Sequence, residues 1–387
     1  MKEYALVLEG GGAKGAYQIG AMKALMENGF KFNTVIGTSI GAINAAFIAQ
    51  GDMDKVEELW KTLSFKELMD INNELIENVM TNQVTVEDLK EIRNTINKTI
   101  KDKGIDLKLM RDIMSKYIDE DKVRNSKIRY GLVTFCITDF KPQKLFIEDI
   151  PKGKLIDYLL ATSNLPGFQR AIIDEKSFLD GGVFDNCSVE MLYDAGYRDI
   201  LALRLFRKNN IRNYNSLIKN KDLKLKMIVP SMDLPNILNF ETKTLNSLLK
   251  YGYVDAIKQI KKLDGTQYVF NKISDEEIEE YKNKFTPITC LKITEEANVK
   301  FKPGDNIIDV TIKKTFTKLN NMVAEQKSSN FKKQLINIVE YVAQKEKITP
   351  NKIYDFKEFV TEVKAKAEKR KKLKGIDKAI YLIIENL

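Results

Sequence analysis

The sequence contains no histidine among its 387 residues. Histidine is the commonest general base near neutral pH and the commonest metal ligand, so its absence excludes a Ser-His-Asp triad. The three cysteines, Cys136, Cys187 and Cys290, are far apart in the sequence and form no Cys-x-x-Cys pair. We therefore expect buried free thiols, with neither a zinc site nor a disulfide framework.

Long apolar runs are also missing. No run is long enough to span a bilayer. The apolar run near the N-terminus follows Glu3 and precedes no small-residue cleavage pattern, so we interpret it as a core strand and not as a Sec signal peptide. With 43% hydrophobic residues, 30% charged residues and only 8 prolines, the composition is that of a globular protein. We expect a cytoplasmic protein without a transmembrane helix, although export by a signal-independent route would leave no trace in the sequence.

Positive charge is concentrated in the second half. The first 200 residues carry 26 Lys and Arg against 31 Asp and Glu, whereas the remainder carries 37 against 23. An anionic partner would dock on the basic half. Aromatic residues are not interleaved with the cations and no recognition motif is present, so we do not expect a nucleic-acid partner.

A cluster of cations near the C-terminus has two interpretations. Lys369–Lys374 precedes Ile376, Ala379, Ile380 and Ile383, which recur at helical spacing. The segment could lie peripherally on an anionic membrane surface. Alternatively, its isoleucines pack on the protein core while the cations face water, which is the more usual role of a charge run.

The N-terminal stretch Tyr4–Gly15 organises the rest of the chain. Ala5–Leu8 is a short, uninterrupted apolar run, which is typical of a parallel strand buried on both faces. Gly10, Gly11 and Gly12 follow, and glycines let a ligand approach backbone N–H groups closely. A helical pattern begins directly afterwards, so the loop lies at the positive end of a helix and suits a negatively charged oxygen.

Two nucleotide-binding interpretations of this loop fail. Its spacing matches the dinucleotide fingerprint, but the second predicted strand, Thr34–Ile36, does not end in the acidic residue that binds a ribose. A P-loop is excluded because Lys14 is followed by Gly15. The second strand runs instead into Gly-Thr-Ser-Ile-Gly at 37–41, which places Ser39 at a strand-to-helix turn with glycines on both sides, as in a nucleophile elbow.

A serine hydroxyl needs a base to act as a nucleophile. Without histidine, a carboxylate must accept the proton of Ser39, and Asp180 is the best candidate. It follows the short apolar strand Ser177–Leu179, and Gly181 and Gly182 allow the chain to turn away so that the carboxylate projects into a cleft. Asp-Gly-Gly is also an ordinary turn sequence.

Alternation of strands and helices over the first 200 residues predicts a three-layer α/β/α sandwich with a mostly parallel central sheet, followed by a mainly helical C-terminal region. We expect a catalytic domain at 1–265, with a helical insertion or lid at 53–126, and a helical region at 266–387. The predicted strands lie at 5–8, 34–36, 127–136, 143–147, 177–179 and 199–206, with a last edge strand at 226–230.

The motifs at 10–15, 37–41 and 180–182 occur in that order, with 141 residues from Ser39 to Asp180, and resemble the three signatures of patatin-like phospholipases. Secondary matches are Ala161-Thr162-Ser163, Pro166-Gly167-Phe168 and Asp185-Asn186. The resemblance covers residues 4 to about 260. The sequence departs from the family pattern at Lys14, where arginine is common, and at Cys187-Ser188, where a proline is usual.

The resemblance implies a Ser-Asp dyad, with Ser39 as nucleophile and Asp180 as proton acceptor. The N–H groups of Gly11 and Gly12, helped by Gly10, would form the oxyanion hole. Lys14, Gly15, Gly37, Gly41, Gly181 and Gly182 would support these motifs.

The implied reaction is hydrolysis of acyl esters in phospholipids or other lipids through an acyl-enzyme, and the dyad needs no metal or cofactor. Two alternatives remain. A patatin-fold acyltransferase would share every catalytic residue and exclude water. A catalytically silent module would bind lipid or protein. The sequence gives no oligomeric state.

Overall fold

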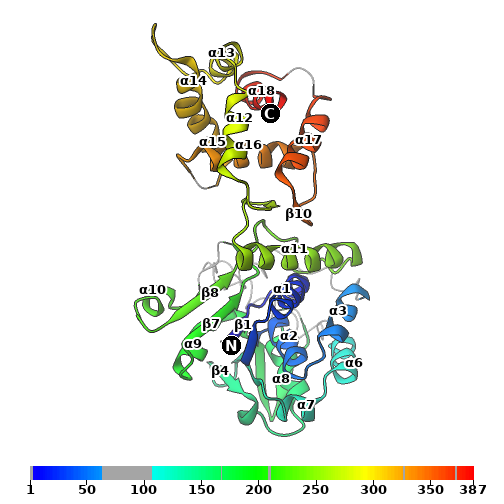
Figure 1. The fold of residues 1–387 in the computed structure, drawn as a ribbon. Coiled ribbons are helices and arrows are strands. Elements are labelled where there is room, and N and C mark those ends of the chain that lie inside the picture. The colour runs from blue at the N-terminus through cyan, green and yellow to red at the C-terminus, as the bar shows by residue number, and fades with distance from the viewer. Residues whose placement is uncertain (1–2, 63–106, 167, 208–210, 326, 371–372) are drawn as a thin grey trace. The chain divides into compact units, whose positions relative to one another are not determined.

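The computed structural model describes residues 3–62, 107–166, 168–207, 211–325, 327–370 and 373–387 (Figure 1). The chain divides into two compact units, Met1–Ile260 and Lys261–Leu387. Of the predicted lid at 53–126, residues 63–106 lie outside the described residues, as does Gly167.

One sheet forms the centre of the N-terminal unit. Its strands are β1 (Glu3–Leu8), β2 (Lys31–Thr38), β3 (Arg129–Cys136), β4 (Lys141–Phe146), β5 (Ala171–Ile173), β6 (Lys176–Asp180), β7 (Asp199–Leu203) and β8 (Lys224–Ile228). They are ordered β5-β6-β3-β2-β1-β7-β8, and β4 pairs with β3 outside this path. The pairs among β3, β2, β1, β7 and β8 are parallel, whereas β4, β5 and β6 pair antiparallel. Short turns join β3 to β4 and β5 to β6. A short turn allows only antiparallel pairing, because parallel strands need a longer crossover connection.

Helices cover both faces of this sheet, which confirms the predicted α/β/α fold. On one face, α9 and α10 pack on a cluster that includes Val7, Ile36 and Val133. On the other, Tyr130 of β3 donates a hydrogen bond of 3.2 Å to the carbonyl of Ala42 in α2, and α8 packs on β3 and β6. The helices of this unit are α1 (Gly15–Glu27), α2 (Ile40–Ala49), α3 (Met53–Thr62), α6 (Lys108–Tyr117), α7 (Glu120–Arg124), α8 (Leu155–Thr162), α9 (Val189–Asp194), α10 (Tyr214–Leu217) and α11 (Thr242–Lys261).

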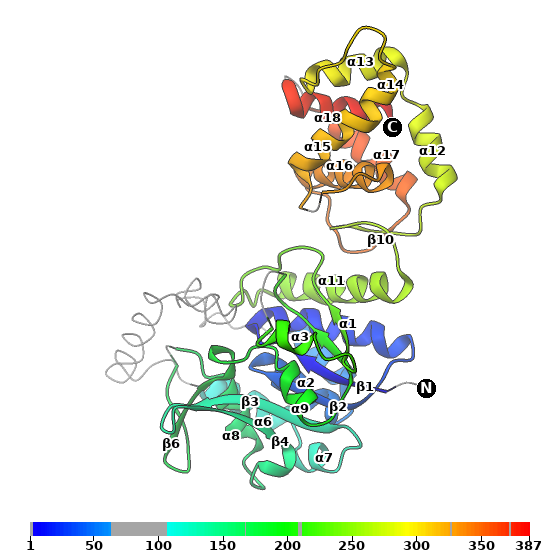
Figure 2. The same cartoon turned by 90° about the vertical axis from the view of Figure 1, so that its left-hand side faces the viewer.

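Helices α1 and α11 approach each other closely (Figure 2). A Cβ atom at Gly20 would collide with the carbonyl of Leu249, and one at Gly252 would collide with the carbonyl of Tyr17. The same helices share a buried hydrogen bond of 3.0 Å, which the Tyr17 hydroxyl donates to Asp255. Two glycines therefore permit a contact that fixes the helix following the glycine loop.

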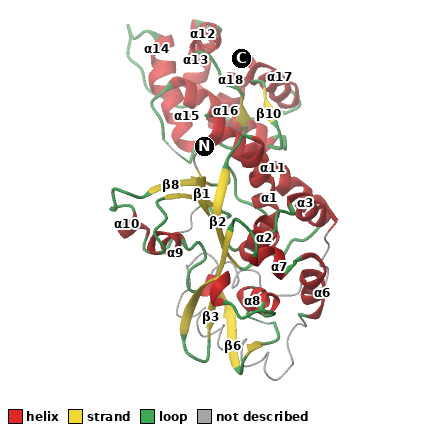
Figure 3. Ribbon diagram, turned by 60° about the horizontal axis from the view of Figure 1, so that its bottom comes forward, coloured by secondary structure: helices red, strands yellow, loops and turns green. Residues whose placement is uncertain are grey.

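The C-terminal unit is almost entirely helical (Figure 3). Its core includes the packed rings of Tyr268, Phe270, Tyr354 and Phe359. The elements are α12 (Asp275–Asn283), α13 (Pro287–Glu296), α14 (Ile307–Val310), a π-helical turn (Thr311–Thr315), α15 (Phe316–Val323), α16 (Phe331–Lys345), α17 (Phe356–Ala367), α18 (Gly375–Asn386) and the short parallel pair β9 (Val269–Phe270) and β10 (Ile353–Tyr354).

Helix α18 contains the isoleucines that follow the C-terminal cations. Ala379, Ile380 and Ile383 are fully buried in the core of the C-terminal unit, so this apolar face packs within the protein. Throughout the described ranges, no helix has both the length and the apolar composition needed to cross a bilayer.

Candidate active site

The register of β3 places Ser39 beside Asp180. Strand β4 occupies one edge of β3 along most of its length, so β2 and β6 share the other edge. Thr38, the last residue of β2, pairs with Val133, and Asp180, the last residue of β6, pairs with the next residue, Thr134. The two candidate residues, distant in sequence, therefore meet where β2 ends and β6 ends.

Ser39 lies on a tight turn between β2 and α2. Its φ of 55° and ψ of −129° are unusual for a residue other than glycine. A Cβ atom at Gly37 would collide with the backbone of Gly41, and one at Gly41 would collide with the carbonyl of Leu8. The Ser39 N–H donates a hydrogen bond of 2.9 Å to Thr162 Oγ1. The flanking glycines are thus a steric requirement of the turn.

Asp180 is fully buried at the other side of this junction. The Gly182 N–H donates a hydrogen bond of 2.7 Å to its Oδ1, whereas Oδ2 has no regular hydrogen-bond partner among the described residues. Burial raises the pKa of Asp180 to about 7, opposed by hydrogen bonding from the Ser39 hydroxyl and the Gly182 N–H. The hydroxyl is thus near enough to affect the pKa without a regular hydrogen bond, as is common in active sites without substrate.

The glycine loop lies next to this pair. A Cβ atom at Gly10 would lie 3.1 Å from Ser39 Cβ. The Gly10 N–H is engaged, because it donates a hydrogen bond of 3.1 Å to the carbonyl of Asn186. Among the described residues, the N–H groups of Gly11 and Gly12 have no such partner. The Gly10 N–H is thus engaged while those of the two following glycines are not, and the oxyanion-hole role expected for the three glycines stays a prediction.

Close packing explains two further glycines of the loop. Gly12 has a φ of 54°, and a Cβ atom there would collide with the carbonyl of Ile237. That carbonyl accepts a hydrogen bond of 2.7 Å from Ala13. A Cβ atom at Gly15 would lie 2.7 Å from Ile40 Cγ1 and 2.9 Å from the Trp60 ring. A larger residue at Gly12 would push the chain away from Ile237, and one at Gly15 would push it away from the start of α2.

Two charged residues beside the loop are buried. The Lys14 ammonium lies 4.0 Å from the centre of the Phe206 ring, a cation–π contact. Glu9 accepts hydrogen bonds from Arg204 Nε at 3.1 Å and from the Leu205 N–H at 2.5 Å, which holds the segment after β7 against the loop. We did not identify Glu9 from the sequence, although a lone acid between an apolar strand and three glycines is an unusual signal.

The C-terminal end of α8 and the residues that follow it also support the pair, in a way that the sequence did not reveal. Thr162 Oγ1 accepts from Ser39 and donates to the carbonyl of Val133. The carbonyl of Asn164 accepts a hydrogen bond of 2.9 Å from the Asp180 N–H. Thr162, the last residue of α8, and Asn164, in the loop after it, therefore contact the two candidate catalytic residues.

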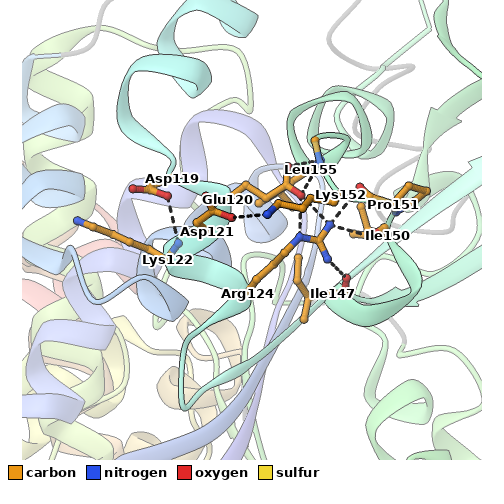
Figure 4. A network of polar contacts seen from close by, with 11 residues as sticks. Asp119, Glu120, Asp121, Lys122, Arg124, Ile147, Ile150, Pro151, Lys152 and Leu155 are labelled. Carbon is orange, nitrogen blue, oxygen red and sulfur yellow. Dashed lines mark hydrogen bonds and ion pairs between the residues drawn. The ribbon is translucent and has the colours of Figure 1, made fainter.

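A polar network holds the other end of α8 (Figure 4). Glu120 accepts hydrogen bonds from the N–H groups of Gly153, at 2.8 Å, and Leu155, at 3.1 Å. Arg124 pairs with Glu120 and donates to the carbonyl of Ile150 at 2.7 Å. Helix α8 is thus anchored to α7 at its start and to Ser39 at its end.

Residues 6–193 match the family model for patatin-like phospholipases. Over these residues, just under half of its length, the chain is similar to patatin-like phospholipases. The match includes the three motifs that carry Gly11, Ser39 and Asp180, and ends within α9.

Two curated relatives show the extent of this likeness. Patatin-like phospholipase domain-containing protein ZK370.4 of Caenorhabditis elegans is 26% identical over 269 residues, which cover 68% of this chain and 18% of that protein. Lysophospholipase nte1 of Aspergillus terreus is 31% identical over 199 residues, covering 51% of this chain and 12% of that protein. The chain thus spans less than a fifth of the length of either relative.

Among solved structures, VipD from Legionella pneumophila aligns with 99% of this chain and 91% of its own. The TM-score is 0.41 and the sequence identity 13%.

Proposed function

We propose that this patatin-like protein hydrolyses acyl esters of phospholipids or related lipids, with Ser39 as nucleophile and Asp180 as its base. The observation that carries the proposal is the meeting of a strained serine turn and a buried carboxyl at the β2–β3–β6 junction. The match of residues 6–193 to patatin-like phospholipases supports a lipid ester as the substrate class.

In the proposed first step, Ser39 Oγ attacks the ester carbonyl carbon while its proton passes to the Asp180 carboxylate. The N–H groups of Gly11 and Gly12 stabilise the negative charge that develops on the carbonyl oxygen. The carbon–oxygen bond to the leaving alcohol then breaks, and Asp180 returns the proton to that oxygen. An acyl-enzyme on Ser39 remains.

The second step repeats this chemistry with water. Asp180 accepts a proton from water as the oxygen attacks the acyl-enzyme, and then returns the proton to Ser39 Oγ as the fatty acid leaves. The Asp180 pKa of about 7 supports this role, because a base whose pKa lies near the working pH accepts and releases protons efficiently.

A lipid substrate requires contact with a membrane or micelle, and we propose that this contact is peripheral. The buried isoleucines of α18 do not supply it. Sedimentation with anionic vesicles would test the contact, and a protein that remains entirely in the supernatant would contradict it.

The function is tested with a panel of phospholipids and lysophospholipids. We expect Ser39→Ala to reduce fatty-acid release to background without loss of folding, while Ser216→Ala, at an exposed serine of α10, retains full activity. Release that survives Ser39→Ala in pure protein would contradict the proposal.

Labelling and product analysis separate the alternatives. A fluorophosphonate should label Ser39 in an enzyme and leave a silent binding module unlabelled. With an alcohol acceptor present, an acyltransferase would form a new ester in place of free fatty acid.

A further inference from the structure

A cavity lies in the N-terminal unit, at the edge of the sheet. It has a volume of about 420 Å³ and is bounded by residues of α6, α8 and β5. Ligand pockets are typically ~300–1,000 Å³ in size. Ser39 and Asp180 are not among its lining residues, so it is distinct from the proposed catalytic pair.

The charged lining of this cavity is predominantly positive. Lys108, Arg111 and Arg170 line it together with a single carboxylate, Asp157. Asp157 is already neutralised, because it lies 2.8 Å from Arg111 and 3.6 Å from Lys154. Arg170 is exposed and makes no hydrogen bond or ion pair with the described residues. Its positive charge is available to a ligand.

The remaining lining is largely apolar. Leu160 comes from α8, and Ile172 and Ile173 come from β5. Ile173 is buried, whereas 64% of Ile172 is exposed at the edge strand of the sheet. Apolar surface exposed to water is unfavourable relative to buried apolar surface. A ligand with an apolar part over Ile172 and an anionic group at Arg170, two residues away, would bury the first side chain and pair with the charge of the second.

We propose that this cavity binds a single-chain anionic lipid of the fatty-acid type, with its chain along Ile172 and Leu160 and its anionic head at Arg170. The positive lining matches a carboxylate or phosphate head, and the apolar wall matches one alkyl chain. This binding site is separate from the proposed site of hydrolysis. A lipid can therefore bind there whether or not the protein hydrolyses esters.

Calorimetric titration of the Ser39→Ala protein tests the proposal without catalysis. The probes are dodecanoate, dodecyl phosphate and uncharged dodecanol, each below its aggregation concentration. We expect both anions to bind more tightly than the alcohol, and the ratio between the anions identifies the preferred head group. Equal affinity for all three, or no binding, would overturn the proposal.

Substitutions in the same background locate the bound lipid. Arg170→Gln should weaken dodecanoate binding roughly threefold to tenfold, the range expected for loss of one partly solvated charge contact. Lys152→Gln is its control, at a lysine side chain 80% exposed outside the cavity. Ile172→Asp should abolish binding, because it removes apolar contact and adds a repelling charge.

The matched control for this change is Ile288→Asp, since Ile288 is 70% exposed in the C-terminal unit. Binding that is unchanged by Arg170→Gln and Ile172→Asp, or weakened equally by the controls, would place the lipid elsewhere and contradict the proposal. Fatty-acid release by the wild type is measured separately, so failure of the hydrolase proposal would leave this result intact.

Discussion

Gly10 and Asn186 are joined by two hydrogen bonds. The Gly10 N–H donates to the Asn186 carbonyl at 3.1 Å, and Asn186 Nδ2 donates to the Gly10 carbonyl at 3.0 Å. The contact ties the glycine loop to the segment that follows Asp180, so the candidate oxyanion donors and the candidate base are fixed relative to each other.

We expect Asn186→Ala to lower kcat at least tenfold and the free energy of unfolding by about 1–3 kcal/mol, because the buried Gly10 carbonyl loses its donor. Asn246→Ala is the control, since Asn246, a half-buried residue of α11, bonds among the described residues only to the carbonyl of Thr242, one turn earlier in the same helix. Steady-state kinetics and denaturant unfolding measure the two effects. A stability loss with unchanged kcat would show that the contact does not position the loop.

The pH dependence of the reaction should follow Asp180. Burial raises the pKa of this carboxyl to about 7, and only its ionised form can accept the proton of Ser39. The rate should therefore rise with pH through about 7 and reach a plateau above it. Measurement of kcat/KM for a soluble ester across this range checks the midpoint. A rate already at its plateau near the ordinary carboxyl pKa of about 4 would show that burial does not raise the pKa of the reacting carboxyl.

Replacement of Asp180 by asparagine should stabilise the protein at alkaline pH while removing activity. The folded-state pKa of about 7 lies above the ordinary value, so the folded protein holds a proton that the unfolded chain releases. Stability from this group is present in acid and lost as pH rises through about 7.

Asparagine remains neutral at every pH and its Oδ1 can still accept from Gly182. At about pH 8, we expect the free energy of unfolding of Asp180→Asn to exceed that of the wild type by at most about 4 kcal/mol. Denaturant unfolding of both proteins at about pH 5 and about pH 8 tests this. If the difference in unfolding free energy between the two proteins were the same at both pH values, burial would not raise the pKa of Asp180.

The sequence predicted the layers of the N-terminal unit because its buried strands are short apolar runs and its turns carry glycine. It predicted Ser39 and Asp180 as candidates from residue type and local context. Their meeting depends on β2 and β6 pairing with the same edge of β3, and strand pairing leaves no local pattern. Strand β5 was missed because three residues are too few to show alternation.

The sequence also could not show which N–H groups of the glycine loop are hydrogen-bonded within the protein and which are not. Gly10, Gly11 and Gly12 are identical in sequence terms, yet the first N–H is bound by Asn186. Likewise, Thr162 belongs to a segment whose sequence resembles that of patatin-like phospholipases. Its hydrogen bond with Ser39, however, joins two segments that are distant in the sequence. These contacts are properties of the assembled fold.

Substitutions at Thr162 test whether the nucleophile turn depends on this hydrogen bond. Thr162 Oγ1 accepts from the Ser39 N–H at 2.9 Å and donates to the Val133 carbonyl. Thr162→Val keeps the shape but leaves two buried backbone groups unpaired, so we expect a loss of about 1–3 kcal/mol in stability and a lower kcat. Thr162→Ser restores the hydroxyl and should recover kcat despite the missing methyl group. Because both variants alter core packing, a serine variant as inactive as the valine variant would assign the effect to packing and exclude a positioning role for the hydroxyl.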